Sequence, residues 1–313
     1  DTLQVPDSVR WDEAAERWVA AHYDTVPAWR IEQRLGGLVV TSWVDEDGRL
    51  IRAESPLGFT LERTEFELAR QEWRASRGDR TLAAGYGAII ESTAIASNAP
   101  LDSVEVRDRL RVRLLDVELD GLDLAGGRQA LFGDTLVVER ETAIEAGYRL
   151  PYRGGGEAAE ELVATPLVQS NDPRVVRVAQ RIAGGETDPV EVARRLNEWV
   201  YARLEKDIVA SVPSAVQVLE AGKGDCNEHT VLYVALARAL GLPARTAAGL
   251  VHVRGQFYYH AWPEVWLGGR WVAVDPTLGQ FPADASHLRM VVGGLARQLE
   301  LVRLIGRLRL EVL

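Results

Sequence analysis

Hydrophobic spacing changes along this chain of 313 residues, and the order of the changes limits the fold. Apolar and polar residues alternate over much of residues 29–152, as they do in half-buried strands. Helical spacing dominates residues 171–240, and three strand-like runs follow. Strands, then helices, then antiparallel strands predict an α+β fold with a mainly β N-terminal domain and an α+β domain after it.

Local signals predict individual elements within the N-terminal half of the chain. Residues 8–24 have helical spacing and are predicted to form a helix, as is the shorter stretch 61–76. Residues 45–48, Asp-Glu-Asp-Gly, separate two strand-like runs and predict a hairpin turn. A calcium loop is the rival interpretation of that turn, but the third acidic ligand and the closing glutamate are absent. Residues 104–119 and 136–152 predict further strands.

A glycine-rich stretch, Arg-Gly-Gly-Gly-Glu at 153–157, is the best candidate for a linker. We therefore predict a mainly β domain of unknown role over residues 1–153 and an α+β domain over residues 154–313. The last segment, residues 293–313, predicts a final strand or short helix, with a membrane-surface helix as the alternative.

Capping signals define the helices of the second domain. Asp172 and Asp188 each precede a proline and an apolar run, as residues at helix starts do. A third helix is predicted from Cys226 to Leu240, closed by Gly241.

Charge and hydropathy exclude several partners. The net charge is -10 and no run of Lys and Arg forms a basic face, so we expect no nucleic-acid partner. No apolar stretch approaches the roughly 20 residues needed to span a bilayer. The sequence opens at Asp1 and its only methionine is Met290. We therefore expect a removed start, membrane association only through that removed segment, and a periplasmic or secreted location.

The only cysteine, Cys226, stands at the start of the third predicted helix, after Gly222-Lys223-Gly224-Asp225. A single cysteine cannot form an intramolecular disulfide, so thiol chemistry is limited to this position. Unpaired N–H groups and the helix dipole favour a thiolate at a helix start. The Cys226 N–H is also expected to face a developing oxyanion.

Two further residues complete a nucleophilic site. His260 lies on a strand-like run among aromatic residues and is the predicted base for the thiol. Asp275 lies on the next strand-like run, after the Gly268-Gly269 turn, and is predicted to orient the histidine ring. Adjacent antiparallel strands would bring His260 and Asp275 together across the hairpin.

Three sequence blocks resemble the transglutaminase-like superfamily, distant relatives of the papain-like cysteine proteases. They are GKGDCNEHTVLYVALARALGLPAR, HAWPEVWL and WVAVDPT, and the resemblance covers roughly residues 165–290. It implies that Cys226 is the nucleophile, His260 the base and Asp275 the orienting acid. The implied reaction is acyl transfer from an amide of a peptide or protein through a thioester. Hydrolysis is slightly favoured over transamidation.

Alternatives to this site stay open in the sequence. Cys226, His229 and His260 could bind a metal with Asp275 or Glu264 as a further ligand, but we expect neither metal nor cofactor. We expect His229 and Glu228 to pack near the cleft, and Gln217 is a weak candidate for a second oxyanion donor. A non-catalytic module that binds a peptide in the same cleft is the second functional hypothesis. The sequence leaves the oligomeric state open.

Overall fold

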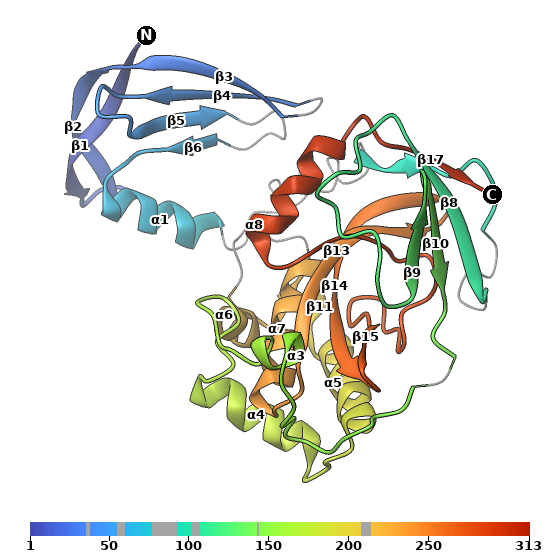
Figure 1. Cartoon of the computed structure of the whole chain (residues 1–313). Coiled ribbons are helices and arrows are strands. Elements are labelled where there is room, and N and C mark those ends of the chain that lie inside the picture. Colours follow the sequence, from blue (N-terminus) through green and yellow to red (C-terminus); the bar gives the residue numbers. More distant parts are fainter. Residues whose placement is uncertain (36–37, 55–59, 77–92, 102–106, 143, 208–213) are drawn as a thin grey trace. The chain divides into compact units, whose positions relative to one another are not determined.

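The computed structural model describes residues 1–35, 38–54, 60–76, 93–101, 107–142, 144–207 and 214–313. The chain divides into two compact units, Asp1–Ser92 and Thr93–Leu313 (Figure 1). Among the described residues, no helix has the length and apolar character needed to cross a bilayer.

Strands dominate the first unit, as predicted. Two of them form an antiparallel pair, β1 (Thr2–Asp12) and β2 (Arg17–Pro27). A four-stranded antiparallel sheet follows in the order β3 (Trp29–Leu35), β4 (Leu38–Val44), β5 (Leu50–Glu54) and β6 (Thr60–Glu62), and then helix α1 (Phe66–Ser76). The hairpin turn predicted at residues 45–48 is confirmed, because the Gly48 N–H donates to the Asp45 carbonyl at 3.0 Å.

The helix predicted over residues 8–24 is wrong, because this stretch contributes to β1 and β2. In the turn between them, Asp12 Oδ1 accepts the N–H groups of Ala14 and Ala15 at 3.1 Å each. Trp11 and Trp18 stand opposite each other across the pair, with ring centroids 5.6 Å apart. Cross-strand aromatic pairing has outweighed the local preference for helix.

The second unit holds two larger sheets. The first runs in the order β15 (Arg270–Ala273), β14 (Gln256–Leu267), β13 (Ala244–Val253) and β16 (Leu288–Val292), and the short β7 (Ile95–Ala96) also pairs with β14. The second runs in the order β17 (Arg309–Val312), β8 (Arg109–Leu115), β10 (Thr135–Glu139) and β9 (Gln129–Phe132). The parallel pair β11 (Glu205–Lys206) and β12 (Lys223–Gly224) is separate from both.

Most helices of this unit lie within residues 157–239. They are α3 (Glu157–Glu160), α4 (Pro173–Ala183), α5 (Pro189–Arg203), α6 (Ala215–Ala221), α7 (Cys226–Ala239), α8 (Leu295–Gln298) and the 3₁₀ helix η2 (Leu299–Leu304). The predicted caps are confirmed: Asp172 accepts from the Arg174 N–H, and Asp188 from the Val190 and Glu191 N–H groups. The tail, predicted as a final strand or a short helix, contains both: α8 and η2 are followed by β17 (Arg309–Val312).

The predicted domain boundary near residue 153 differs from the observed division at Ser92 and Thr93. The C-terminal strand β17 pairs with β8, so the two ends of this unit share one sheet. The buried residues of β8 and β10 also pack in one core with those of β13 and β16. Their apolar faces therefore need the C-terminal strands for burial, and residues 153–156 are a surface connection within one unit. Residues 104–106 of the predicted strand lie outside the described part of the chain.

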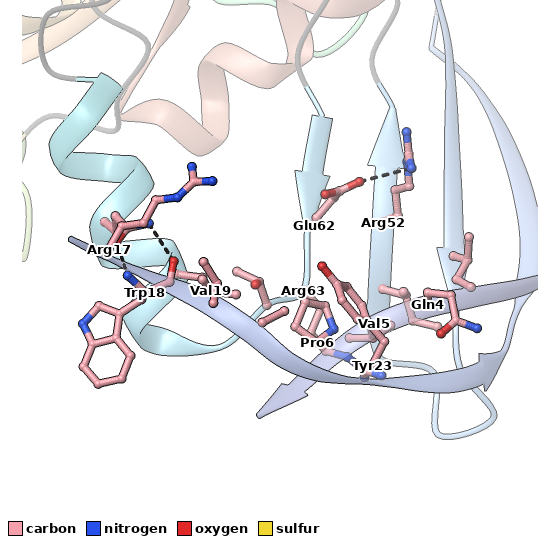
Figure 2. Close-up of a pocket in the computed structure, with 16 residues that line it drawn as sticks. Gln4, Val5, Pro6, Arg17, Trp18, Val19, Tyr23, Arg52, Glu62 and Arg63 are labelled. Atoms are coloured by element: carbon pink, nitrogen blue, oxygen red, sulfur yellow. Dashed lines mark hydrogen bonds and ion pairs between the residues drawn. The ribbon is translucent and has the colours of Figure 1, made fainter. Parts of the chain in front are cut away.

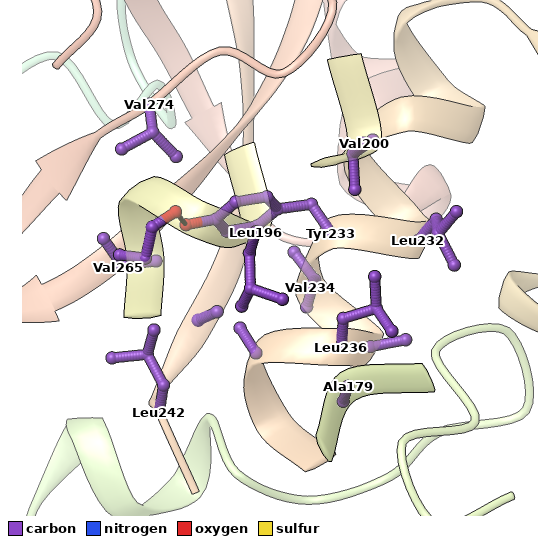
Figure 3. Packing of buried hydrophobic residues seen from close by; sticks show 14 of the residues in the cluster. Ala179, Leu196, Val200, Leu232, Tyr233, Val234, Leu236, Leu242, Val265 and Val274 are labelled. Carbon is purple, nitrogen blue, oxygen red and sulfur yellow. Dashed lines mark hydrogen bonds between the residues drawn. The ribbon is translucent and has the colours of Figure 1, made fainter. Parts of the chain in front are cut away.

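A second core joins helices α4 to α7 to the strands β14 and β15. Figure 3 shows Leu232, Tyr233 and Leu236 of α7 among Leu196 of α5 and Val265 of β14. All five side chains are fully buried, and the Tyr233 hydroxyl donates to the Ala193 carbonyl at 3.1 Å. This packing fixes α7, and therefore its N-terminus, against the sheet.

Candidate active site

The start of α7 presents Cys226 in a defined geometry. Asp225 is the N-cap, and its side chain accepts the Asn227 N–H at 2.8 Å. Glu228 completes a capping box by accepting the Asp225 N–H at 3.0 Å. The capping box satisfies backbone donors beside Cys226 and fixes where the helix begins.

Cys226 meets the sheet at Ala261. The strand β14 pairs with β7 at Gln256 and Phe257 and with β15 from Glu264 to Leu267. Ala261 lies between these two pairings, and its N–H donates a hydrogen bond to the sulfur of Cys226. The hydrogen bond thus holds the thiol against Ala261, the residue that follows His260 in β14.

His260 and Asp275 are in contact, as the hairpin argument predicted. His260 Nε2 lies 2.8 Å from Asp275 Oδ2. Asp275 follows β15, which pairs with β14, so the hairpin supplies both residues. The His260 side chain is 8% exposed and that of Asp275 is fully buried.

Asp275 is an ionised acceptor with all its oxygens in use. Its Oδ1 accepts the N–H groups of Thr277 at 2.7 Å and Leu278 at 2.9 Å. Burial by itself would raise the pKa of this carboxyl group, but the charges and hydrogen bonds of His260 and His287 hold the pKa well below its usual range. Because an ionised carboxylate can only accept, the hydrogen on His260 is carried by Nε2, and Nδ1 is the ring nitrogen left to take a proton.

The loop after Asp275 passes over an aromatic ring on α5. Gly279 has φ +73°, and a Cβ added there would lie 3.0 Å from the Tyr201 ring. Tyr201 and Leu278 are partly exposed, and the Lys206 ammonium lies 4.1 Å from the centroid of the Tyr201 ring. The loop after Asp275 therefore lies against an aromatic ring of α5 that also contacts a cation of β11.

The thiol is less acidic than its place at a helix start predicts. Burial raises the pKa of Cys226 well above its ordinary value, and the negative charge of Asp225 acts in the same direction. The Ala261 N–H opposes this shift without reversing it. A preformed thiolate is therefore not favoured by the surroundings of Cys226 alone, and a base must remove the proton as the thiol reacts.

Other residues singled out in the sequence have structural partners. Lys223 Nζ lies 2.7 Å from Asp207 Oδ2. Gln217 accepts from Ser214 in the capping box of α6, so nothing links it to an oxyanion. Glu228 is buried, and burial with its hydrogen bond to Asp225 raises its pKa to about 9.

His229 is fully buried, with Nδ1 2.7 Å from the Asp225 carbonyl, and burial lowers its pKa.

The metal site considered from the sequence is not the cluster that the structure forms. Among the described residues, the ligand atoms of His260, Asp275 and His287 lie within 4.8 Å of one another, without Cys226 or His229. Glu264 instead forms ion pairs with Arg245 and Arg289. Both histidine nitrogens already lie at hydrogen-bond distance from Asp275, which accounts for the cluster without an ion.

His287 is the residue that sequence reasoning missed. Its Nε2 lies 2.9 Å from Asp275 Oδ2, and its Nδ1 lies 3.1 Å from Asp284 Oδ1. The available signal was the Asp-Ala-Ser-His run at 284–287, with a histidine three residues after an acid. Nothing in that run indicates contact with Asp275, because the contact depends on the loop between β15 and β16.

The first unit has a groove of its own, of about 390 Å³. Figure 2 shows its lining, which includes Arg17, Arg52, Glu62 and Arg63. Arg52 pairs with Glu62 at 3.1 Å and Arg63 with Asp45 at 2.7 Å. Arg52, Glu62 and Arg63 are thus already paired, and the groove gives no chemical indication of a ligand.

Comparison with known proteins gives one family. Residues 176–276 match the family model of the Transglutaminase-like superfamily, so the chain contains a transglutaminase-like domain. An uncharacterized protein of Haemophilus influenzae is 32% identical over 99 residues, which are 30% of this chain and 27% of that protein. The match thus spans about a quarter of the length of that relative.

Solved structures of low similarity accompany this match. A proposed cysteine protease from Cytophaga hutchinsonii is 15% identical with a TM-score of 0.41, covering 66% of this chain and 81% of the other. The periplasmic domain of TgpA from Pseudomonas aeruginosa is 17% identical with a TM-score of 0.39, covering 58% of this chain and 76% of the other.

Proposed function

We propose that this protein is a cysteine-dependent acyl-transfer enzyme in which Cys226, His260 and Asp275 perform the chemistry. The observation that carries the proposal is the chain of contacts from Cys226 to the Ala261 N–H, and from the adjacent His260 to Asp275. The match of residues 176–276 to the transglutaminase-like superfamily supports the same reaction class.

In the proposed first half-reaction, Cys226 attacks the carbonyl carbon of an amide while its proton passes to His260 Nδ1. The Cys226 N–H belongs to the first turn of α7, where backbone donors have no partner within the helix, and it would face the oxyanion. The tetrahedral intermediate collapses, the C–N bond breaks, and the amine leaves with the proton from His260. A thioester on Cys226 remains.

In the second half-reaction, an acceptor attacks the thioester while His260 removes its proton, and the thiol leaves with that proton. Water gives hydrolysis and a primary amine gives transamidation. We place water first, because hydrolysis needs no second binding site for an amine. The substrate class that we propose is a peptide or protein, and we keep a periplasmic or secreted location as a prediction.

The raised pKa of Cys226 favours a second candidate function, a peptide-binding module that uses the same surface without catalysis. In that case the thiol would be an ordinary, partly buried one, and His260 would have no influence on its reactivity.

Alkylation of Cys226 distinguishes these functions. The rate of labelling by limiting iodoacetamide is measured by intact mass from pH 5 to pH 9 in the wild type, His260→Ala and His22→Ala. His22 lies on β2 in the other unit and provides a matched control. Faster labelling of the wild type than of His260→Ala, with His22→Ala unchanged, would support the enzyme. Equal rates in all three proteins would support the binding module.

The acceptor is then identified with one substrate mixture. Dimethylated casein is incubated with a biotin-labelled primary amine, and both casein fragments and biotin incorporation are measured. Fragments that disappear in Cys226→Ser would indicate peptide-bond hydrolysis, and biotin incorporation that disappears in the same variant would indicate transamidation.

A further inference from the structure

Asp275 shares one of its oxygens between two histidines. His260 Nε2 lies 2.8 Å and His287 Nε2 lies 2.9 Å from the same atom, Oδ2. The second histidine continues to Asp284 through Nδ1, so four side chains form the series His260, Asp275, His287, Asp284. Asp284 and His287 lie beyond the residues that match the family model.

The hydrogen bonds of the two carboxylates fix the protonation of His287. Asp284 accepts the N–H and the hydroxyl of Ser286 at 2.8 and 2.6 Å, and its other oxygen accepts from Gln280 Nε2 at 2.8 Å. Asp275 likewise accepts two backbone N–H groups. Both carboxylates therefore act as ionised acceptors. A histidine between two acceptors must donate from both ring nitrogens, so His287 is an imidazolium.

The other surroundings of His287 are aromatic or form pairs of their own. The Trp262 and His260 rings lie 5.1 and 6.0 Å from its ring, centroid to centroid. A cavity of about 10 Å³ lined by His287 is also lined by Arg128, Glu264 and Arg289, and the last two pair with each other. Burial would lower the pKa of His287, but its hydrogen bonds to Asp275 and Asp284 raise it.

We propose that His287 is a positioning residue for the acyl-transfer site: as a buried imidazolium anchored by Asp284, it holds the Asp275 carboxylate in place for His260. This inference rests on the proposed function. Without the cation, Asp275 would be a buried carboxylate with one partner fewer, and either protonation or rotation would remove the acceptor that orients His260. Because both ring nitrogens of His287 already donate to carboxylates, the proton of the reaction passes between Cys226, His260 and the substrate.

A direct measurement of protonation tests the inference without using activity. Long-range ¹H–¹⁵N spectra of the imidazole rings are recorded on the wild type between pH 5 and pH 9. The chain has five histidines, and variants of single histidines assign the signals. We expect His287 to bear hydrogen on both ring nitrogens throughout this range. A neutral His287 at pH 7 would overturn the inference.

A pair of matched substitutions tests the positioning role. His287→Gln keeps one donor but removes the charge, and His252→Gln makes the same change on β13, where the ring packs edge-on against Phe257. We expect His287→Gln to slow alkylation of Cys226 about 10- to 100-fold and to change the pH dependence of the rate, as loss of an orienting partner does. The His252→Gln rate should stay within about twofold of the wild type.

The outcomes separate this inference from the proposed function. If His260→Ala slows alkylation and His287→Gln does not, only the inference fails. If neither slows alkylation, the proposed function fails, and the spectra still report the state of His287. Should His287→Gln not fold, Asp284→Asn removes one charge from the pair, and an unchanged rate and pH profile would overturn the inference. Stoichiometric zinc bound by His260, Asp275 and His287 in the purified protein would also overturn it.

Discussion

The two units of this chain differ most in the size of their hydrophobic cores. Among the described residues, the core of the first unit contains three buried apolar side chains, Val5, Ala28 and Ile51. The second unit has two extensive apolar clusters, which meet the helices on one side and the second sheet on the other. A large core can enclose charged groups that satisfy one another, whereas a thin one leaves its charges at the surface.

The distribution of buried polar side chains follows this difference. Asp45 is the buried charged residue described in the first unit, and it lies in a hairpin turn where Arg63 pairs with it at 2.7 Å. The second unit buries Asp275, His287 and Glu264 with full sets of partners. Chemistry that needs fixed charges away from water is therefore expected in the second unit.

The largest expected contrast between the units is in activity. Cys226→Ala should lower acyl transfer by on the order of 10⁴- to 10⁶-fold, because it removes the nucleophile. Arg63→Ala, which breaks the pair with Asp45 in the first unit, should leave the rate within about twofold. Turnover of the substrate identified with the casein assay provides the measurement. An equally inactive Arg63→Ala would show that the first unit takes part in the reaction, and the contrast would be lost.

Asp275→Asn should lower the rate by about 10⁴-fold, because an amide in place of the carboxylate presents a donor to His260 and favours the wrong tautomer. The same change alters stability in acid. The folded-state pKa of Asp275 is lowered, so its contribution is complete above the unfolded-state value of about 4 and is lost as pH falls below it.

Urea unfolding from pH 3 to pH 7 measures this effect. The wild type should lose stability toward pH 3, and Asp275→Asn should lose less over the same interval. Parallel curves for the two proteins would mean that Asp275 is not held ionised by its partners.

Matched truncations compare the two cores directly. Leu236→Ala removes a fully buried side chain of α7 and should cost about 2–5 kcal/mol of unfolding free energy. Leu3→Ala removes a partly buried side chain from the first core and should cost less than about 2 kcal/mol. Chemical denaturation followed with separate probes for the two units gives both values. Equal costs would mean that the first unit is better packed than its core suggests.

A pH-dependent effect on stability is expected at Glu228. Its folded-state pKa of about 9 lies above the unfolded value of about 4.3, so its contribution is fully present below the unfolded pKa and is lost as pH rises toward 9. Glu228→Gln keeps an oxygen that can accept the Asp225 N–H in the capping box, but its amide does not titrate. The variant should therefore gain up to roughly 4 kcal/mol relative to the wild type from pH 5 to pH 8, since each pH unit between the two pKa values corresponds to about 1.4 kcal/mol.

Urea unfolding at pH 5 and at pH 8 provides the measurement, and Glu46→Gln in the exposed turn of the first unit is the control. A gain that does not change with pH would contradict the raised pKa of Glu228.

Sequence patterns were reliable where each signal is local to the element that it predicts. Asp172 and Asp188 cap helices because their side chains reach N–H groups two or three residues away, and the turn at residues 45–48 closes in the same way. Residues 8–24 show the converse. Their strands are stabilised by pairing with each other, and in a thin unit with both faces partly exposed the apolar spacing that would identify a strand is weak.

The sequence by itself determined the order of strands and helices in the second unit, the helix that begins at Cys226, and the hairpin on which His260 and Asp275 meet. Capping, turn formation and apolar spacing act over a few residues, so a single stretch of sequence contains them. Only the tertiary structure decided that β17 completes the sheet of β8, that burial raises the pKa of Cys226, and that His287 reaches Asp275. Each of these depends on which distant segments of the chain pack against one another and exclude water. Desolvation and hydrogen bonds between distant segments are therefore not determined by neighbouring residues in the sequence.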